Sequence, residues 1–277
     1  MRILAPAKLN LCLYLGPRRD DGLHELCSLF EPLALADLIE VEEAEADEIV
    51  CEAIEGENLA ERALAGLRAL GWESPPLRIE IEKRTPIAAG LGGGSADAAA
   101  VLRLAAGAVA DLPELAAELG ADVPSQLIPA LSLVQGAGER VERLPEPAPH
   151  AVVLLPGGSG LSTAAVFDEA DRLGLGRDGS ELDEIAAALR EAAGAGASPL
   201  AYSEWLVNDL EPAALALRPE IGDALDALRS AGAGHTMLTG SGPTAVGVCE
   251  SLAAAERVAE RLGRQVGSIV CEAGAPP

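Results

Sequence analysis

The sequence predicts an α+β protein built in two layers, with strands and helices mixed along the chain rather than strictly alternating. Three observations predict this fold class. Residues 1–15 alternate between apolar and polar side chains in the manner of a strand. A glycine-rich segment at 86–95 joins a second strand to an apolar helix, and an apolar run at 151–155 opens a further series of strands and helices.

The first half of the chain is expected to contain three strands and three helices. The strands are residues 1–15, 33–43 and 77–83, and the helices are 58–71, 96–107 and 113–119, the last ending near Gly120. In the first strand we expect one face to carry only leucines and the other to carry polar and aromatic side chains. The leucine face is Leu9, Leu11, Leu13 and Leu15, and the opposite face is Lys8, Asn10, Cys12 and Tyr14.

The second half follows a proline-rich linker at 145–149, so the predicted domains are 1–149 and 150–277. We expect strands at 151–155 and 245–249, and helices at 181–192, 212–230 and 251–263. A turn of small residues spans 239–244, and residues 16–22 form another turn after the first strand.

The composition excludes several classes of protein. With 277 residues, of which 49% are hydrophobic, the chain is long enough for one large domain or two modest ones, and disorder is excluded as a general description. The sequence holds no long uncharged apolar run and residues 1–8 lack signal-peptide features, so we expect a cytoplasmic protein. A net charge of -24 and 2% aromatic residues argue against nucleic acid and anionic membranes as partners.

The five cysteines are expected to be reduced thiols. Their number is odd and no two have CxxC spacing, which argues against a disulfide framework or a zinc site. Lys8 and Lys83 are the only lysines, and both lie beside the motifs described next.

The segment from Pro86 to Ala100 is the most informative part of the chain. A helix start after a strand offers unpaired backbone N–H groups, and glycines let that backbone approach an anion closely, so a phosphate is the expected occupant. Ser95 is expected either to cap the helix or to place its hydroxyl near a phosphate or its metal. The segment is neither GxxxxGK[ST] nor a strict GxGxxG, which excludes a P-loop NTPase and a Rossmann dehydrogenase. The alternative is a flexible glycine turn without a ligand.

Three ordered motifs resemble the GHMP kinase family, named for galactokinase, homoserine kinase, mevalonate kinase and phosphomevalonate kinase. The motifs are Pro6-Ala7-Lys8-Leu9-Asn10-Leu11, the glycine segment Pro86–Ala100 and Leu238-Thr239-Gly240-Ser241-Gly242-Pro243-Thr244. The resemblance implies two domains, each a two-layer α/β sandwich, with the active site in the cleft between them. It also implies ATP and Mg²⁺ as cofactors, with metal ligands that the sequence does not identify.

Further segments resemble one branch of the family. They include residues 19–26, Gly120-Ala121-Asp122-Val123-Pro124, 136–140, 161–163 and 208–211, and they span nearly the whole chain. This branch phosphorylates the 2-hydroxyl of a cytidine diphosphate-linked methylerythritol in non-mevalonate isoprenoid precursor biosynthesis. The resemblance therefore implies a small-molecule substrate. We expect a monomer or a homodimer. The alternatives are another GHMP kinase, acting on homoserine or mevalonate, and a nucleotide-binding relative without catalysis.

The resemblance gives Lys8 and Asp122 the catalytic roles. Lys8 would attract the γ-phosphate and keep Asp122 ionised, and Asp122 would either take or only orient the hydroxyl proton. From residue type alone, Asp122 is also compatible with a turn residue, and Lys8 with a solvated strand residue.

The resemblance also assigns two groups of binding residues. The cofactor-binding group is Asn58, Pro86, Ala88, Ala89, Gly90, Leu91, Gly92, Gly93, Gly94, Ser95 and Ala96. The substrate-binding group is Asn10, Leu23, His24, Phe30, Phe167, Gly240 and Ser241.

Some of these residues also have structural interpretations. Asn58 can be a helix cap, His24 a structural histidine and Gly240-Ser241 part of a hairpin-like turn. Leu23 departs from the family, which usually has a tyrosine there to stack on cytosine, whereas Phe167 keeps the opposing aromatic.

Overall fold

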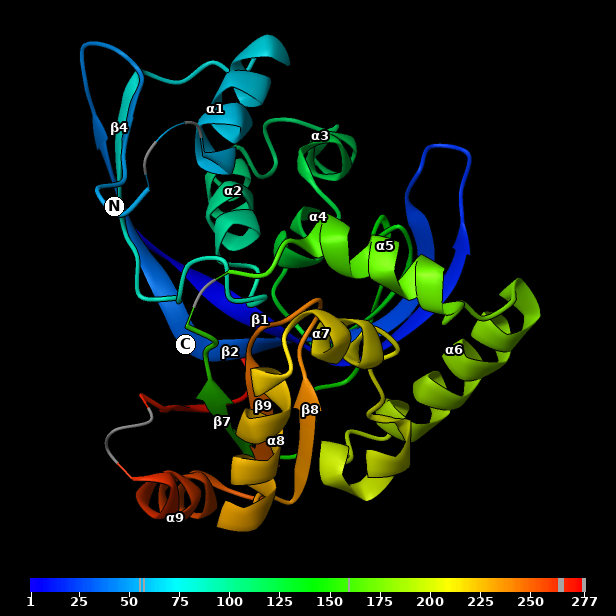
Figure 1. The fold of residues 1–277 in the computed structure, drawn as a ribbon. Coiled ribbons are helices and arrows are strands. Elements are labelled where there is room, and N and C mark those ends of the chain that lie inside the picture. The colour runs from blue at the N-terminus through cyan, green and yellow to red at the C-terminus, as the bar shows by residue number, and fades with distance from the viewer. Residues whose placement is uncertain (55, 57, 159, 264–266, 276–277) are drawn as a thin grey trace.

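Two β-sheets, one from each half of the chain, form the framework of the molecule (Figure 1). This computed structural model describes residues 1–54, 56, 58–158, 160–263 and 267–275. The first sheet has the strand order β3-β4-β2-β5-β6, with β1 paired to β2. Its strands are β1 (Arg2–Arg18), β2 (His24–Glu43), β3 (Glu48–Val50), β4 (Leu77–Glu82), β5 (Ser132–Gly136) and β6 (Arg140–Arg143).

The second sheet has the order β10-β7-β9-β8, and its neighbouring strands pair antiparallel in the described residues. Its strands are β7 (Ala151–Leu155), β8 (His235–Leu238), β9 (Ala245–Cys249) and β10 (Ile269–Glu272). The first sheet differs in one pairing, because β3 lies parallel to β4.

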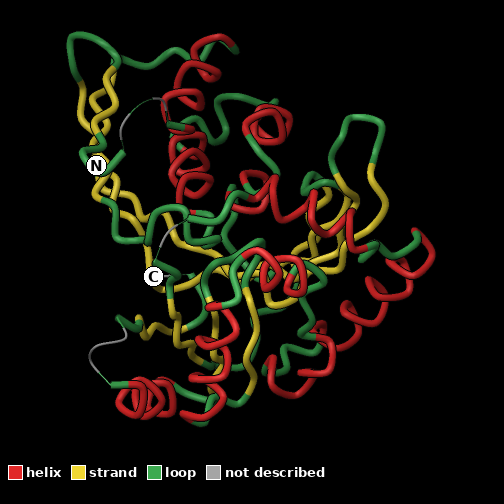
Figure 2. The backbone as a smooth tube through the Cα atoms, viewed as in Figure 1, coloured by secondary structure: helices red, strands yellow, loops and turns green. Residues whose placement is uncertain are grey.

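Helices lie on both sheets, as the tube view shows (Figure 2). The helices of the first half are α1 (Leu59–Ala69), α2 (Gly93–Arg103), α3 (Leu112–Leu119) and α4 (Val123–Gln126). Those of the second half are α5 (Thr163–Leu173), α6 (Gly179–Gly194), the 3₁₀ helix η1 (Pro199–Trp205), α7 (Glu211–Leu217), α8 (Glu220–Ala231) and α9 (Leu252–Leu262). The predicted α+β, two-layer fold class is therefore confirmed.

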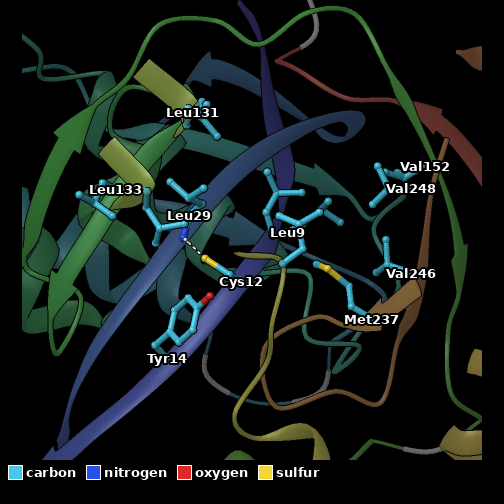
Figure 3. Packing of buried hydrophobic residues seen from close by; sticks show 14 of the residues in the cluster. Leu9, Cys12, Tyr14, Leu29, Leu131, Leu133, Val152, Met237, Val246 and Val248 are labelled. Carbon is cyan, nitrogen blue, oxygen red and sulfur yellow. Dashed lines mark hydrogen bonds between the residues drawn. The ribbon is translucent and has the colours of Figure 1, made fainter. Parts of the chain in front are cut away.

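The central hydrophobic core lies where the two sheets meet. Leu9 and Leu29 of the first sheet and Met237 and Val246 of the second belong to one cluster of buried side chains (Figure 3). Helix α6 packs into the same cluster through residues such as Leu189. Because each buried leucine contributes about 1.5–3 kcal/mol of transfer free energy, this shared core fixes the two sheets relative to each other.

The predicted leucine face of the first strand is wrong. The register between β1 and β2 shifts between Asn10 and Cys12, as at a β-bulge. Such a bulge exchanges the two faces of the strand beyond it. Leu9 and Leu11 therefore pack with Cys12 and Tyr14 in the central core, whereas the two later leucines pack elsewhere.

Two predicted helices also need correction. The predicted helix 212–230 is two helices, α7 and α8, which are separated at Arg218-Pro219 because the residue before a proline is disfavoured in helical geometry. Helix α2 begins at Gly93 rather than Ala96 and ends at Arg103 rather than 107, so the last glycines of the loop form its first turn. The prediction also omitted β3, β5, β6, β8, β10, α4, α5 and η1.

The predicted domain boundary at 149/150 falls in the irregular segment between β6 and β7. It stays a prediction, because the central core draws side chains from both sides of it. All five cysteines are free, and four of them are buried. None of the helices in the described part of the chain has the length and apolar character needed to cross a membrane.

Candidate active site

The glycine segment lies against Lys8 and against the turn at 239–242. Gly92 has a φ of 67°, and a Cβ there would lie 2.9 Å from the Lys8 side chain. Gly90 has a φ of 77°, and a Cβ there would lie 2.9 Å from the carbonyl oxygen of Gly242. Both positions therefore require glycine for backbone conformation and for space. The result is close contact between the segment, β1 and the second sheet's turn.

The start of α2 faces the cavities that this segment lines. Gly92 is the N-cap and its residue type provides no side-chain cap, so the interpretation of Ser95 as the cap is wrong. Ser95 lies instead in the first turn, and it lines two adjoining cavities. The unpaired N–H groups and the positive end of the helix dipole make this turn suited to a phosphate.

Lys8 is buried, so its interpretation as a solvated strand residue is wrong. Its Nζ donates to Asn10 Oδ1 at 2.7 Å and lies 3.2 Å from Asp122 Oδ2. It also lies 4.6 Å from the centre of the Phe30 ring. The Asn10 amide in turn donates to Ser28 Oγ at 3.0 Å. These contacts hold one ammonium group in a defined position.

Asp122 precedes the short helix α4 but does not cap it with its side chain. The carboxylate is 31% exposed, which leaves it accessible from the cavity while it pairs with Lys8. Arg103 holds α4 in place, since it donates to Gln126 O at 2.7 Å and to Leu4 O at 2.8 Å. One guanidinium thereby ties the helix after Asp122 to the strand that carries Lys8.

Three cavities adjoin one another here, and the Lys8–Asp122 ion pair lines the central one. The loop cavity, about 290 Å³, is lined by Ile54, Leu59, Lys83 and residues 86–95. The central cavity, about 250 Å³, shares Gly90, Gly92 and Ser95 with the loop cavity. The central cavity is lined by Lys8, Asn10, Leu13, Leu26, Phe30, Gly90, Gly92, Ser95, Ala121, Asp122, Thr163, Phe167, Leu210, Gly240 and Ser241.

The outer cavity, about 350 Å³, adjoins the central cavity through Leu26, Ala121, Thr163 and Phe167. It is lined by Arg18, Gly22, Leu23, His24, Leu26, Ala121, Ala137, Thr163, Ala164, Phe167 and Asp168. The His24 and Phe167 rings lie 5.2 Å apart at an angle of 36°. An apolar wall with one imidazole suits a flat ring that carries a few polar groups.

Most of the residues assigned from the sequence are brought together by this arrangement. The two catalytic candidates and Asn10, Phe30, Phe167, Gly240 and Ser241 line the central cavity. The outer cavity adds Leu23 and His24, and the loop cavity adds Pro86, Ala88, Ala89, Leu91, Gly93 and Gly94.

Asn58 and Ala96 line none of the three cavities. Asn58 caps α1, where its Oδ1 accepts from Glu61 N at 3.0 Å. Ala96 is fully buried in the hydrophobic cluster under α2. Their roles as cofactor-binding residues stay predictions.

A buried charge cluster that no sequence pattern predicted lies beneath the glycine segment. Lys83 Nζ donates to Asp97 Oδ2 at 2.7 Å and also to Asp37. Asp37 in turn accepts from the backbone N–H of Thr85 at 2.7 Å. A Cβ on Gly93 would lie 3.1 Å from Lys83 Nζ, so the cluster directly supports the first turn of α2. The one sequence signal was that Lys83 is one of only two lysines.

Burial raises the pKa of Asp97 to about 7, although the Lys83 ammonium acts in the opposite direction. Burial alone would lower the pKa of Lys83, but the two carboxylates together raise it. The cluster therefore keeps the Lys83 ammonium charged, while burial favours the protonated form of Asp97.

Asn208 lies in a segment that resembles the family but was assigned no role, and it fixes the turn that carries Gly240 and Ser241. Its buried amide donates to Leu238 O and to Gly240 O, both at 2.8 Å. Thr239 Oγ1 accepts from the backbone N–H of Asn10 at 2.9 Å, which joins the turn to β1. The small-residue turn is therefore held against the strand that carries Lys8.

Comparison with known proteins places this arrangement among kinases. The family model described as "GHMP kinases N terminal domain" matches residues 58–128, and the one described as "GHMP kinases C terminal" matches residues 185–268. The chain is 38% identical to the 4-diphosphocytidyl-2-C-methyl-D-erythritol kinase of Thermobifida fusca, over 94% of this chain and 90% of that protein. It is 35% identical to the kinase of the same name from Pseudarthrobacter chlorophenolicus, over 100% of this chain and 93% of that protein.

Solved structures agree with these matches. A crystal structure of 4-(cytidine 5'-diphospho)-2C-methyl-D-erythritol kinase superposes with a TM-score of 0.81 at 37% identity, covering 99% of each chain. The homoserine kinase of Cytophaga hutchinsonii gives a TM-score of 0.70 at 18% identity, covering 98% of this chain and 93% of that one, which shows the shared fold alone. The chain belongs to the GHMP kinase family.

Proposed function

We propose that this chain transfers the γ-phosphoryl group of ATP to the 2-hydroxyl of 4-diphosphocytidyl-2-C-methyl-D-erythritol. The observation that supports this most is the Lys8–Asp122 pair, 3.2 Å apart in a cavity between the glycine segment and the outer cavity. Relatives that match nearly the whole chain carry the name of this kinase. The proposed product is a precursor in isoprenoid biosynthesis by the non-mevalonate route.

The three cavities divide the two substrates among them. The first turn of α2 would bind the phosphates of ATP through backbone N–H groups, with the adenosine toward the loop cavity. The outer cavity would take the cytosine ring against Phe167, with His24 as its hydrogen-bonding partner and Leu23 as an apolar contact. The methylerythritol hydroxyl then reaches the central cavity, where Asp122 is accessible.

Phosphoryl transfer requires mainly positioning and positive charge around the moving group. Lys8 supplies an ammonium group that Asn10 and Phe30 hold at a fixed position. Asp122 accepts a hydrogen bond from the attacking hydroxyl and thereby orients its oxygen toward the γ-phosphate.

The site fits Mg²⁺ bound mainly through phosphates. The described residues contain no group of three or more His, Cys, Asp or Glu side chains that could hold a metal. Mg²⁺ in kinases commonly uses one or two protein oxygens together with phosphate oxygens and water, so such a group is not required. Ser95, which lines both the loop cavity and the central cavity, would provide that protein oxygen. The ion would neutralise charge on the phosphates.

Substrate-dependent release of ADP tests the proposal. The purified protein is assayed with ATP and Mg²⁺ alone, then with 4-diphosphocytidyl-2-C-methyl-D-erythritol, homoserine or mevalonate. We expect ADP release only with the cytidyl substrate. A clear preference for homoserine or mevalonate would show that the protein is a different GHMP kinase and would contradict the proposed substrate. ATP binding without release on any substrate would instead indicate a nucleotide-binding relative without catalysis.

A further inference from the structure

The two ring nitrogens of His24, in the outer cavity, have different surroundings. Nε2 lies 2.8 Å from Asp171 Oδ1, and the imidazole is only 6% exposed. Nδ1 makes no hydrogen bond to any residue in the described part of the chain. Nε2 is therefore engaged by the protein, whereas Nδ1 has no partner among the described residues, and the side chain that carries both nitrogens lines the outer cavity.

Helix α5 holds the imidazole from two sides. Phe167 and Asp171 are four residues apart, so they share one face of the helix. The Phe167 ring packs against His24 while the Asp171 carboxylate accepts at its edge. Arg18 Nη1 lies 3.6 Å from Asp171 Oδ2, and Arg18 Nε donates to Gly22 O at 3.2 Å. The carboxylate is thus itself oriented by the hairpin that precedes His24.

This geometry determines what the neutral imidazole offers to the cavity. A carboxylate can only accept, so the hydrogen bond requires the proton on Nε2. In a neutral ring the proton on Nε2 leaves Nδ1 as an acceptor. Cytosine carries a 4-amino group, which donates to such an acceptor. Uracil carries a 4-oxo group, which would face it with a second acceptor.

We propose that Asp171 is a specificity-determining positioning residue. It holds His24 in the Nε2–H form, so that Nδ1 accepts from the exocyclic amine of a cytosine and disfavours uracil. The inference rests on the proposed function, because it takes the base in the outer cavity to be that of the cytidyl substrate. Asp171 acts through His24 and does not itself touch the base.

The substitution Asp171→Asn reverses this pattern. Arg18 beside Oδ2 favours the amide oxygen on its own side, which turns the amide NH₂ toward His24 Nε2. The imidazole must then carry its proton on Nδ1 and offers a donor to the cavity. Glu169→Gln is the matched control, because it removes the same charge from the same helix. Among the described residues, the ion-pair partner of Glu169 is Arg172, at 2.6 Å.

The test measures binding of cytidine 5'-diphosphate and uridine 5'-diphosphate by calorimetry, with the ATP site saturated by a non-hydrolysable ATP analogue. We expect the unsubstituted protein and the Glu169→Gln variant to prefer the cytidine compound. In Asp171→Asn the ratio of the two affinities should fall by about tenfold or more, because a site built for one hydrogen-bonding pattern rejects the opposite one. Turnover at saturating cytidyl substrate should stay within about twofold while KM rises, since the reacting atoms lie elsewhere. Asp171→Glu, which keeps a carboxylate, should retain the preference.

Each outcome separates this inference from the proposed function. An unchanged affinity ratio in Asp171→Asn, with a thermal unfolding midpoint like that of the unsubstituted protein, would overturn the role of Asp171 whatever the enzyme's activity. Equal binding of the two diphosphates by the unsubstituted protein would overturn it as well. A cytidine preference that Asp171→Asn abolishes, without turnover of the cytidyl substrate, would support the inference and reject the proposed function.

Discussion

Replacement of Lys83 by methionine tests the buried charge cluster under the glycine segment. The side chains of Lys83, Asp37 and Asp97 are 5%, 0% and 4% exposed. At about pH 8, above the pKa of Asp97, removal of the ammonium leaves two carboxylates buried together without a counter-charge. Loss of one partner from a buried pair costs about 3–5 kcal/mol. For a chain of this size, each kcal/mol of lost stability lowers the thermal unfolding midpoint by about 2–4 °C. Lys83→Met should therefore lower this midpoint by about 6–20 °C.

Asp97→Asn should have the opposite effect, and the effect should depend on pH. In the folded state the pKa of Asp97 is raised from 3.8 to about 7. Between these two pH values, the folded protein therefore keeps a proton on Asp97 that the unfolded protein has lost. The free energy of unfolding contributed by this group therefore falls as pH rises through that window. Asparagine resembles the protonated form and avoids the loss, while Lys83 keeps its pairing with Asp37.

Urea unfolding followed by circular dichroism, at about pH 5 and about pH 8, measures both effects. The control is Asp111→Asn, since Asp111 is exposed and makes no side-chain cap. Asp97→Asn should gain stability relative to the unsubstituted protein as pH rises. The account would be refuted by a Lys83→Met variant that loses less than about 1 kcal/mol. The account would also be refuted if the difference in free energy of unfolding between Asp97→Asn and the unsubstituted protein were the same at both pH values.

Three further predictions concern the loop, the core and the outer cavity. Gly93→Val should weaken ATP binding as measured by calorimetry. The valine Cβ would lie 3.1 Å from Lys83, and its two methyl groups would block the phosphates. A folded variant with normal ATP affinity would show that the loop is misassigned. Burial alone would lower the pKa of His150, but the Glu31 carboxylate and a backbone acceptor raise it overall. The His150–Glu31 pair therefore stabilises the fold at low pH, and this contribution is lost as pH rises through the pKa of His150. Glu31→Gln should therefore cost more stability near pH 6 than near pH 9 in urea unfolding, and an equal cost would contradict the pairing. Leu23→Tyr should lower the Kd for cytidine 5'-diphosphate by about 2–10-fold, since stacking adds about 0.5–1.5 kcal/mol, and an unchanged Kd would place the base elsewhere.

Local patterns predicted much of the fold. The strands at 151–155 and 245–249 have the predicted bounds, because continuous apolar runs bounded by turns depend little on distant residues. The bulge in β1 was not predictable, since it depends on the register with β2. The break between α7 and α8 could have been found, because Pro219 disfavours helical geometry at the residue before it.

The candidate site was predictable only in part. The spacing of its glycines and its position before a helix predicted the glycine segment as a phosphate-binding loop. Lys8 and Asp122, by contrast, lie far apart in the chain, and only the family resemblance put them together. The Lys83 cluster and the Asp171–His24 contact depend on tertiary packing that no local pattern encodes.

The most direct test of the central claim is the rate of ADP release by Asp122→Asn, with Asp111→Asn as the control. The assay uses ATP, Mg²⁺ and 4-diphosphocytidyl-2-C-methyl-D-erythritol, and calorimetry measures ATP affinity in parallel. If Asp122 orients or deprotonates the attacking hydroxyl, turnover should fall by about 10²–10⁴-fold while ATP affinity stays the same. Turnover by Asp122→Asn equal to that of the control would contradict the assignment of the Lys8–Asp122 pair as the site of phosphoryl transfer.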